Sequence, residues 1–179
     1  MSERRSRAAL GSFAFYILAP GVVAGLIPWL ISDWQMREVA ISVRLAGMLL
    51  IGAGVTALTY SFVRFVVEGI GTPAPVAPTE HLVVGGLYRY VRNPMYMAVL
   101  TIIIGQSLLL GKWSLIWYAA VAGAAMATFT HFYEEPALAR RFGESYETYR
   151  CNVPAWIPRA TPWHRDGQDQ ADREVRSIE

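Results

Sequence analysis

The sequence has little charge and only one cysteine, and both shortages exclude whole classes of protein. Charged residues make up 17% of the 179 residues, below the roughly 25% of soluble globular chains. The single cysteine, Cys151, excludes a disulfide framework within the chain and a cysteine-based metal site. The histidines lack metal-ligand spacing, and a net charge of +2 without a basic stripe gives no case for nucleic acid as a partner.

What the chain has in abundance is apolar sequence in long runs. Hydrophobic residues make up 54% of it, and about 20 consecutive apolar residues cross the ~30 Å hydrocarbon core of a bilayer. We therefore predict an all-α integral membrane bundle of about four transmembrane helices, at 10–31, 45–67, 94–110 and 113–133. A single membrane domain is expected over 1–158, followed by a polar, disordered tail at 159–179.

Arginine and lysine are distributed unequally between the two sides of these spans. The poorer side has Arg37, Arg44 and Lys112. The richer side has Arg4, Arg5, Arg7, Arg89, Arg92, Arg140, Arg141, Arg150 and Arg159. Because short loops rich in arginine and lysine stay in the cytoplasm, both termini are predicted to be cytoplasmic. In a prokaryote the membrane would be the cytoplasmic membrane. Nothing in the sequence indicates the oligomeric state.

An amphipathic helix is expected after the last span, over about 136–150. Leu138, Phe142, Tyr146 and Tyr149 recur at helical spacing, opposite charged residues. Such a helix lies in the membrane interface with its apolar face down, or it leans on the other spans. The sequence leaves both arrangements open.

Two polar clusters, at 88–96 and 131–136, flank the hairpin formed by the third and fourth spans. Because the hairpin runs out and back, both clusters return to the same side of the membrane and are predicted to form one site. Asn93 and Pro94 suit the N-cap and the first turn of the third span. In a purely structural interpretation, the tyrosines belong to an interfacial belt and the arginines fix the topology.

The chemistry of the combined clusters suits an amino acid joined to an aromatic base and carrying a cation. A carboxylate binds ammonium, an arginine or a backbone N–H binds a carboxylate, and tyrosine rings stack on the base or face the cation. S-adenosylmethionine has all of these parts. Against this, Glu134 and Glu135 could simply pair with Arg89 or Arg92, since carboxylates at the end of a spanning helix need solvent, a partner or a ligand.

In this order, the motifs resemble those of the isoprenylcysteine carboxyl methyltransferase and phospholipid N-methyltransferase group of integral membrane enzymes. The resemblance extends over about 81–158 and is carried by Gly86, Tyr88, Arg92, Asn93, Pro94, Tyr96, Glu134, Glu135, Phe142, Gly143, Tyr146, Tyr149, Val153 and Pro154. Each motif alone is weak, whereas the ordered set is specific. The resemblance implies S-adenosylmethionine-dependent methyl transfer to a lipid or other lipophilic, membrane-associated acceptor, whether a carboxylate, an amine or a thiol.

The resemblance also implies which positions hold the cofactor. They are His81, Leu82, Val83, Tyr88, Asn93, Pro94, Met95, Tyr96 and Glu134. Arg92, Thr130 and Glu135 would support the pocket or the substrate. Asn93 stands where the family has a histidine, and it donates a hydrogen bond but carries no proton at neutral pH. Thr130 stands where the prenylcysteine enzymes have a substrate-binding arginine. These two departures are the best argument for the alternative, a non-enzymatic membrane assembly or binding protein that keeps the fold.

Overall fold

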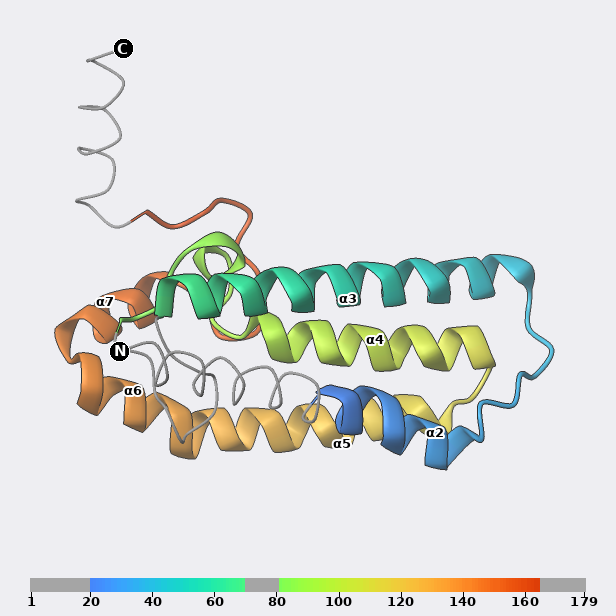
Figure 1. Ribbon diagram of the computed structural model, residues 1–179. Coiled ribbons are helices and arrows are strands. Elements are labelled where there is room, and N and C mark those ends of the chain that lie inside the picture. The colour runs from blue at the N-terminus through green and yellow to red at the C-terminus, as the bar shows by residue number, and fades with distance from the viewer. Residues whose placement is uncertain (1–19, 70–80, 165–179) are drawn as a thin grey trace, which may run out of the picture.

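The computed structural model describes residues 20–69 and 81–164, which fold into a bundle of helices (Figure 1). The elements, in chain order, are the π-turn η1 (Val22–Leu26), α2 (Ile27–Ser32), α3 (Ile41–Gly69), the 3₁₀ turn η2 (Gly86–Arg89), α4 (Pro94–Leu110), α5 (Ser114–Phe129), the π-turn η3 (Thr130–Glu134), α6 (Glu135–Phe142) and α7 (Glu144–Asn152). The described part of the chain contains no strand. The all-α fold class predicted from the sequence is therefore confirmed.

The closest packing in the bundle is between α3 and α4, which run antiparallel side by side (Figure 1). A Cβ atom added to Gly47 of α3 would lie 2.6 Å from the backbone nitrogen of Leu109, and one added to Gly105 of α4 would lie 2.8 Å from the carbonyl oxygen of Gly47. Only glycine permits this approach, which is typical of helix contacts in membranes. The hairpin to α5 turns at Gly111, whose left-handed backbone (φ 67°) ends α4.

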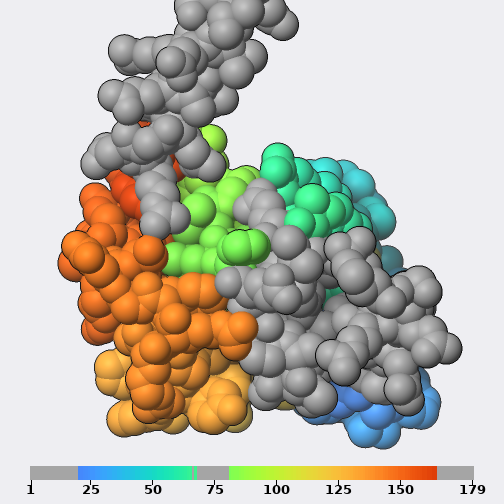
Figure 2. Space-filling model, turned by 60° about the vertical axis from the view of Figure 1, so that its left-hand side comes forward, coloured from blue at the N-terminus to red at the C-terminus, as the bar shows by residue number. Residues whose placement is uncertain are grey.

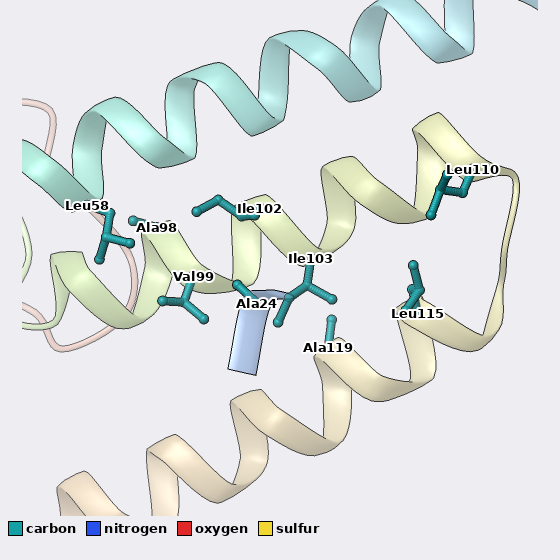
Figure 3. Close-up of a cluster of buried hydrophobic side chains, with 9 residues drawn as sticks. All are labelled: Ala24, Leu58, Ala98, Val99, Ile102, Ile103, Leu110, Leu115 and Ala119. Carbon is teal, nitrogen blue, oxygen red and sulfur yellow. The ribbon is translucent and has the colours of Figure 1, made fainter. Parts of the chain in front are cut away.

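The main core lies where α4 meets α3, α5 and the first helical segment (Figure 3). Ile103 of α4 and Leu115 of α5 are completely buried there. The remaining members of the cluster are Ala24, Leu58, Ala98, Val99, Ile102, Leu110 and Ala119. Because α4 is surrounded on several sides, its start is held firmly relative to the other helices.

The outer faces of the long helices are apolar. Leu49 of α3, Trp117 of α5 and Phe132 of η3 each expose about three quarters of their surface, as expected for side chains that face lipid. Two helical stretches, Ile41–Phe65 and Ser114–Phe142, are long and apolar enough to cross a membrane. Val22–Ser32 and Pro94–Leu110 are shorter apolar helices. These features fit the membrane bundle. The first half of the expected 10–31 span lies outside the described residues, and the number of spans stays a prediction.

The two π-turns share one local cause, a proline two residues beyond the turn. In η1 the N–H of Ile27 bonds the carbonyl of Val22, and Pro28 follows. In η3 the N–H of Glu135 bonds the carbonyl of Thr130, and Pro136 follows. Proline supplies no N–H and its ring crowds the carbonyl four residues earlier. One extra residue in the turn relieves that crowding.

The C-terminal amphipathic segment differs from the single 136–150 helix expected from the sequence. Here α6 continues α5 through η3, and the helix breaks at Gly143 (φ 52°, ψ −128°), after which α7 begins. Tyr146 and Tyr149 of α7 expose only 2% and 3% of their surface, against Leu82, Val84 and Trp163 among others. The apolar face of α7 therefore packs on the 81–93 segment and on Trp163, which differs from both arrangements that the sequence left open.

Candidate functional site

The two polar clusters meet at the end of the bundle where α4 begins and α5 continues into α6. Figure 2 views this end, with α6 and α7 in orange beside the green 81–93 segment. Tyr96 on the first turn of α4 reaches Glu134 at the end of η3, and Arg92 just ahead of α4 reaches Glu135 at the start of α6. The hairpin thus brings side chains 38 and 43 residues apart into direct contact.

Glu134 is bonded by neutral hydroxyl groups. The phenol of Tyr96 donates to its Oε1 at 2.6 Å, and the hydroxyl of Thr130 donates to its Oε2 at 3.3 Å. Thr130 is buried, whereas Tyr96 and Glu134 keep part of their surface exposed. Among the described residues, no cation lies within ion-pair distance of Glu134. This carboxylate therefore has no counter-charge among the described residues, and a cationic ligand could supply one.

Glu135, the next residue, is surrounded by two arginines and a histidine. Arg92 Nη1 lies 2.7 Å from its Oε1, while His131 Nδ1 and Arg150 Nε lie 3.8 and 4.0 Å from its Oε2. The same Nη1 atom of Arg92 also donates to the hydroxyl of Tyr146 at 3.1 Å. The side chains of Arg92 and Glu135 are only 13% and 11% exposed. This buried pair joins the start of α4 to α6 and α7, and a ligand has little access to it.

The 81–93 segment covers this end of the bundle. Gly86 has a positive φ (57°), and a Cβ atom there would lie 2.8 Å from the Tyr60 ring of α3, so packing against α3 explains this glycine. Tyr88 is buried, and its carbonyl accepts a hydrogen bond from the hydroxyl of Tyr149 at 2.7 Å. His81 is exposed and Val83 buried. Among the remaining positions implied for the cofactor, Leu82 packs on α7 and Met95 packs on the main core.

Asn93 occupies the N-cap position of α4, with Pro94 first in the helix, as the sequence predicted. The side chain of Asn93 does not cap the helix, however. Its Nδ2 donates to the carbonyl of Ala155 at 3.1 Å. The prediction that Asn93 is an N-cap is therefore correct in position, but its side-chain oxygen accepts no hydrogen bond from the first turn of α4, and the contact that the structure gives the side chain is the one from Nδ2 to Ala155.

The 153–163 segment is the part of the site that sequence reasoning missed. Its backbone follows the 89–93 segment, with hydrogen bonds from Arg92 N to Pro154 O and from Trp163 N to Arg89 O, both 2.9 Å. The guanidinium of Arg89 donates to the carbonyl of Trp163, so Arg92 and not Arg89 forms the ion pair with Glu135. The Trp156 ring stacks on Tyr96, with centroids 6.3 Å apart. No periodic sequence signal marks these contacts.

The fold and these clusters define an integral membrane helical bundle with a polar, partly exposed site at one end. Residues 43–145, more than half of the chain, match the phospholipid methyltransferase family. The chain therefore belongs to this family, and the resemblance drawn from the motifs is confirmed. It is also similar to a Schizosaccharomyces pombe protein named protein-S-isoprenylcysteine O-methyltransferase, at 37% identity over 81 residues. That match covers 44% of this chain and 34% of the relative, so the chain spans about a third of the relative's length.

Proposed function

We propose that this protein transfers a methyl group from S-adenosylmethionine to a lipid or another lipophilic acceptor. One observation carries the proposal: the Glu134 carboxylate is bonded by neutral hydroxyls, partly exposed, and close to an aromatic pair at the end of an apolar hairpin. A site of this kind suits a ligand that is cationic at one point and aromatic at another. Membership of the phospholipid methyltransferase family supports the same reaction class.

The residues of the site fit the cofactor. The Glu134 carboxylate would take the ammonium group, since an ammonium donor brings a positive charge that the hydroxyl donors of Tyr96 and Thr130 lack. The rings of Tyr96 and Trp156 would take the base or the sulfonium, and backbone N–H groups of the 81–93 segment would take the carboxylate. The bound cofactor supplies an activated methyl group.

In a direct displacement at a methyl carbon, the main contribution of the protein is to align the two reactants. The buried Arg92–Glu135 pair would provide the rigid frame, because it ties the start of α4 to α6 and α7. We propose that both termini face the cytoplasm and that the cofactor arrives from that side. The acceptor's apolar part would reach the site laterally from the bilayer, along the exposed apolar faces of the helices.

The chemical group that accepts the methyl is the open part of the proposal. The family name points to a phospholipid, while the relative from Schizosaccharomyces pombe is named for an isoprenylcysteine. Thr130 is buried and its hydroxyl donates to Glu134, so this position adds no positive charge for a carboxylate acceptor. We therefore favour an amine or thiol acceptor over a carboxylate.

The test is to incubate membranes containing the protein with methyl-labelled S-adenosylmethionine and to separate lipid, protein and water-soluble fractions. We expect the unaltered protein to place label in the lipid fraction and the Glu134→Gln variant to place none there. Tyr133→Phe is the matched control, because Tyr133 is the neighbouring residue and is exposed. Label only in water-soluble acceptors would remove the support for lateral access. No cofactor binding by the purified protein would favour the alternative, a non-enzymatic membrane protein.

A further inference from the structure

Trp156 presents an aromatic ring at this end of the bundle from outside the helices. It belongs to the 153–163 segment, which follows α7, and it is partly exposed. Its plane lies 23° from that of the Tyr96 ring, and Tyr96 in turn donates its hydroxyl hydrogen to Glu134. Trp156 therefore contacts Tyr96, and Tyr96 contacts the Glu134 carboxylate. That carboxylate has no cationic partner among the described residues.

From this arrangement we infer that Trp156 is a binding residue, whose indole face contacts the sulfonium of the cofactor. The inference rests on the proposed function. An indole is the best of the side-chain rings for a cation, and a carboxylate nearby adds attraction for positive charge. Stacking on the neutral base would need the ring alone and would gain nothing from a negative charge beside the ring.

Asn93 holds Trp156 in place. Its Nδ2 donates to the carbonyl of Ala155, the residue next to Trp156. The neighbouring backbone N–H of Arg92 donates to Pro154, so two consecutive residues at the start of α4 bind two consecutive carbonyls of the 153–163 segment. This fixes the segment against the helix that carries Tyr96. Asn93 is thus a positioning residue that acts through its amide hydrogen, and it needs no proton-transfer chemistry.

Variants of Asn93 test whether the side chain must donate a hydrogen bond to the Ala155 carbonyl. Asn93→Asp keeps the shape but replaces the donor with a charged acceptor that faces the Ala155 carbonyl, so the segment should detach. Asn93→His keeps an N–H donor and should restore the contact. Asn152→Asp is the matched control, because the Asn152 amide bonds only the carbonyl of Thr148 in its own helix and is exposed.

The experiment measures, by calorimetry on the purified full-length chain in lipid nanodiscs, the affinities for S-adenosylmethionine and for S-adenosylhomocysteine, which lacks the sulfonium charge. We expect Trp156→Leu to weaken S-adenosylmethionine binding about tenfold, the size of a cation over an indole, and S-adenosylhomocysteine binding less than twofold. Trp156→Phe should lie between. Trp117→Leu, at an exposed site on the outer face of α5, should change neither affinity.

Asn93→Asp should reproduce the Trp156→Leu pattern and speed hydrogen exchange at the amides of Arg159 and Trp163, which donate to the 89–93 segment. Asn93→His and Asn152→Asp should do neither. Equal losses for both ligands in Trp156→Leu would overturn the inference, because the ring would then serve the base or the local fold. Failure of the unaltered protein to bind either ligand would instead overturn the proposed function.

Discussion

Glu134 and Glu135 are the same residue type at consecutive positions, yet their surroundings are opposite. Glu134 accepts from two neutral hydroxyls and stays partly exposed, whereas Glu135 is buried among Arg92, His131 and Arg150. A buried charge whose partner is removed is costly, while a partly exposed carboxylate with no cation beside it is available to a ligand. The difference suggests that one carboxylate binds and the other positions.

The largest expected effect comes from removing the partner of Glu135. Arg92→Leu leaves the buried Glu135 carboxylate with only the more distant Arg150 as a cation of fixed charge, and the Tyr146 hydroxyl without its donor. We expect a loss of about 3–5 kcal/mol in the free energy of unfolding, measured by denaturation in mixed micelles. Arg140→Leu, at an exposed position of α6, is the control. Equal stability of the two variants would remove the structural role assigned to Glu135.

A second, smaller loss of stability is expected from Tyr149 of α7, which lies near the buried Arg92–Glu135 pair. Tyr149→Phe removes the donor to the buried carbonyl of Tyr88 and should cost about 1–3 kcal/mol. Burial raises the pKa of the Tyr149 phenol, so above about pH 10 the unfolded chain loses this proton while the folded chain keeps it. The stabilisation linked to the Tyr149 proton is fully present below about pH 10, and the free energy of unfolding should fall as the pH rises further.

The pH series separates this contribution from general alkaline unfolding. The natural chain should lose stability between about pH 9.5 and 11 more steeply than Tyr149→Phe. Parallel curves for the two proteins would show that the Tyr149 proton is not linked to folding. Cofactor affinity at neutral pH should be unchanged in Tyr149→Phe, because the phenol lies on the positioning side of the cluster.

On the binding side, Tyr96→Phe should weaken cofactor affinity rather than the fold. The substitution removes the short hydrogen bond that orients Glu134 and leaves the stacked ring in place. A hydrogen bond to a charged group contributes about 1.5–3 kcal/mol, and we expect roughly a tenfold loss of affinity for S-adenosylmethionine by calorimetry. An affinity equal to that of Tyr133→Phe would mean that the Tyr96 hydroxyl has no part in binding.

The smallest effect is expected at the far end of α4, which has its own polar contacts. The amide of Gln106 donates to the carbonyl of Ala24 at 2.6 Å, and the hydroxyl of Tyr118 donates to that of Val23 at 2.8 Å. Pro28 has no N–H to donate to the carbonyl of Ala24, four residues earlier. Gln106→Leu should cost about 0.6 kcal/mol, as hydrogen bonds between membrane helices do on average.

Gln106→Leu should leave cofactor affinity unchanged, which makes it a test of how local the site is. A clear loss of affinity in this variant would show that the end of the bundle containing Glu134 depends on packing along the whole of α4. The difference between Glu134 and Glu135 would then depend on the packing of the whole bundle and not on the local surroundings of each residue.

Much of this architecture could be predicted from the sequence, because long apolar runs and a short hairpin determine which helices exist and which polar clusters meet. The division between Glu134 and Glu135 could not. Consecutive helical residues point about 100° apart, and the π-turn at Thr130–Glu134 shifts the facing of both by an amount that the sequence pattern does not encode.

The break at Gly143 and the contacts of Trp156 were also beyond the sequence. A glycine inside a helix costs only about 1 kcal/mol, so Gly143 alone does not decide between one helix and two. The 153–163 segment is held mostly by backbone hydrogen bonds to residues more than 60 positions away, such as that from Arg92 N to Pro154 O. Backbone contacts of that range leave no periodic pattern of side chains.

The most direct test of the central claim is a matched pair, Glu134→Gln and Glu135→Gln, titrated with S-adenosylmethionine and unfolded under the same conditions. We predict that Glu134→Gln loses at least about tenfold in affinity and keeps its stability within about 1 kcal/mol. Glu135→Gln should lose stability by several times that amount, with a smaller change in affinity for the folded fraction. The reverse pattern, or equal effects of the two substitutions on both quantities, would contradict the separation of binding from positioning.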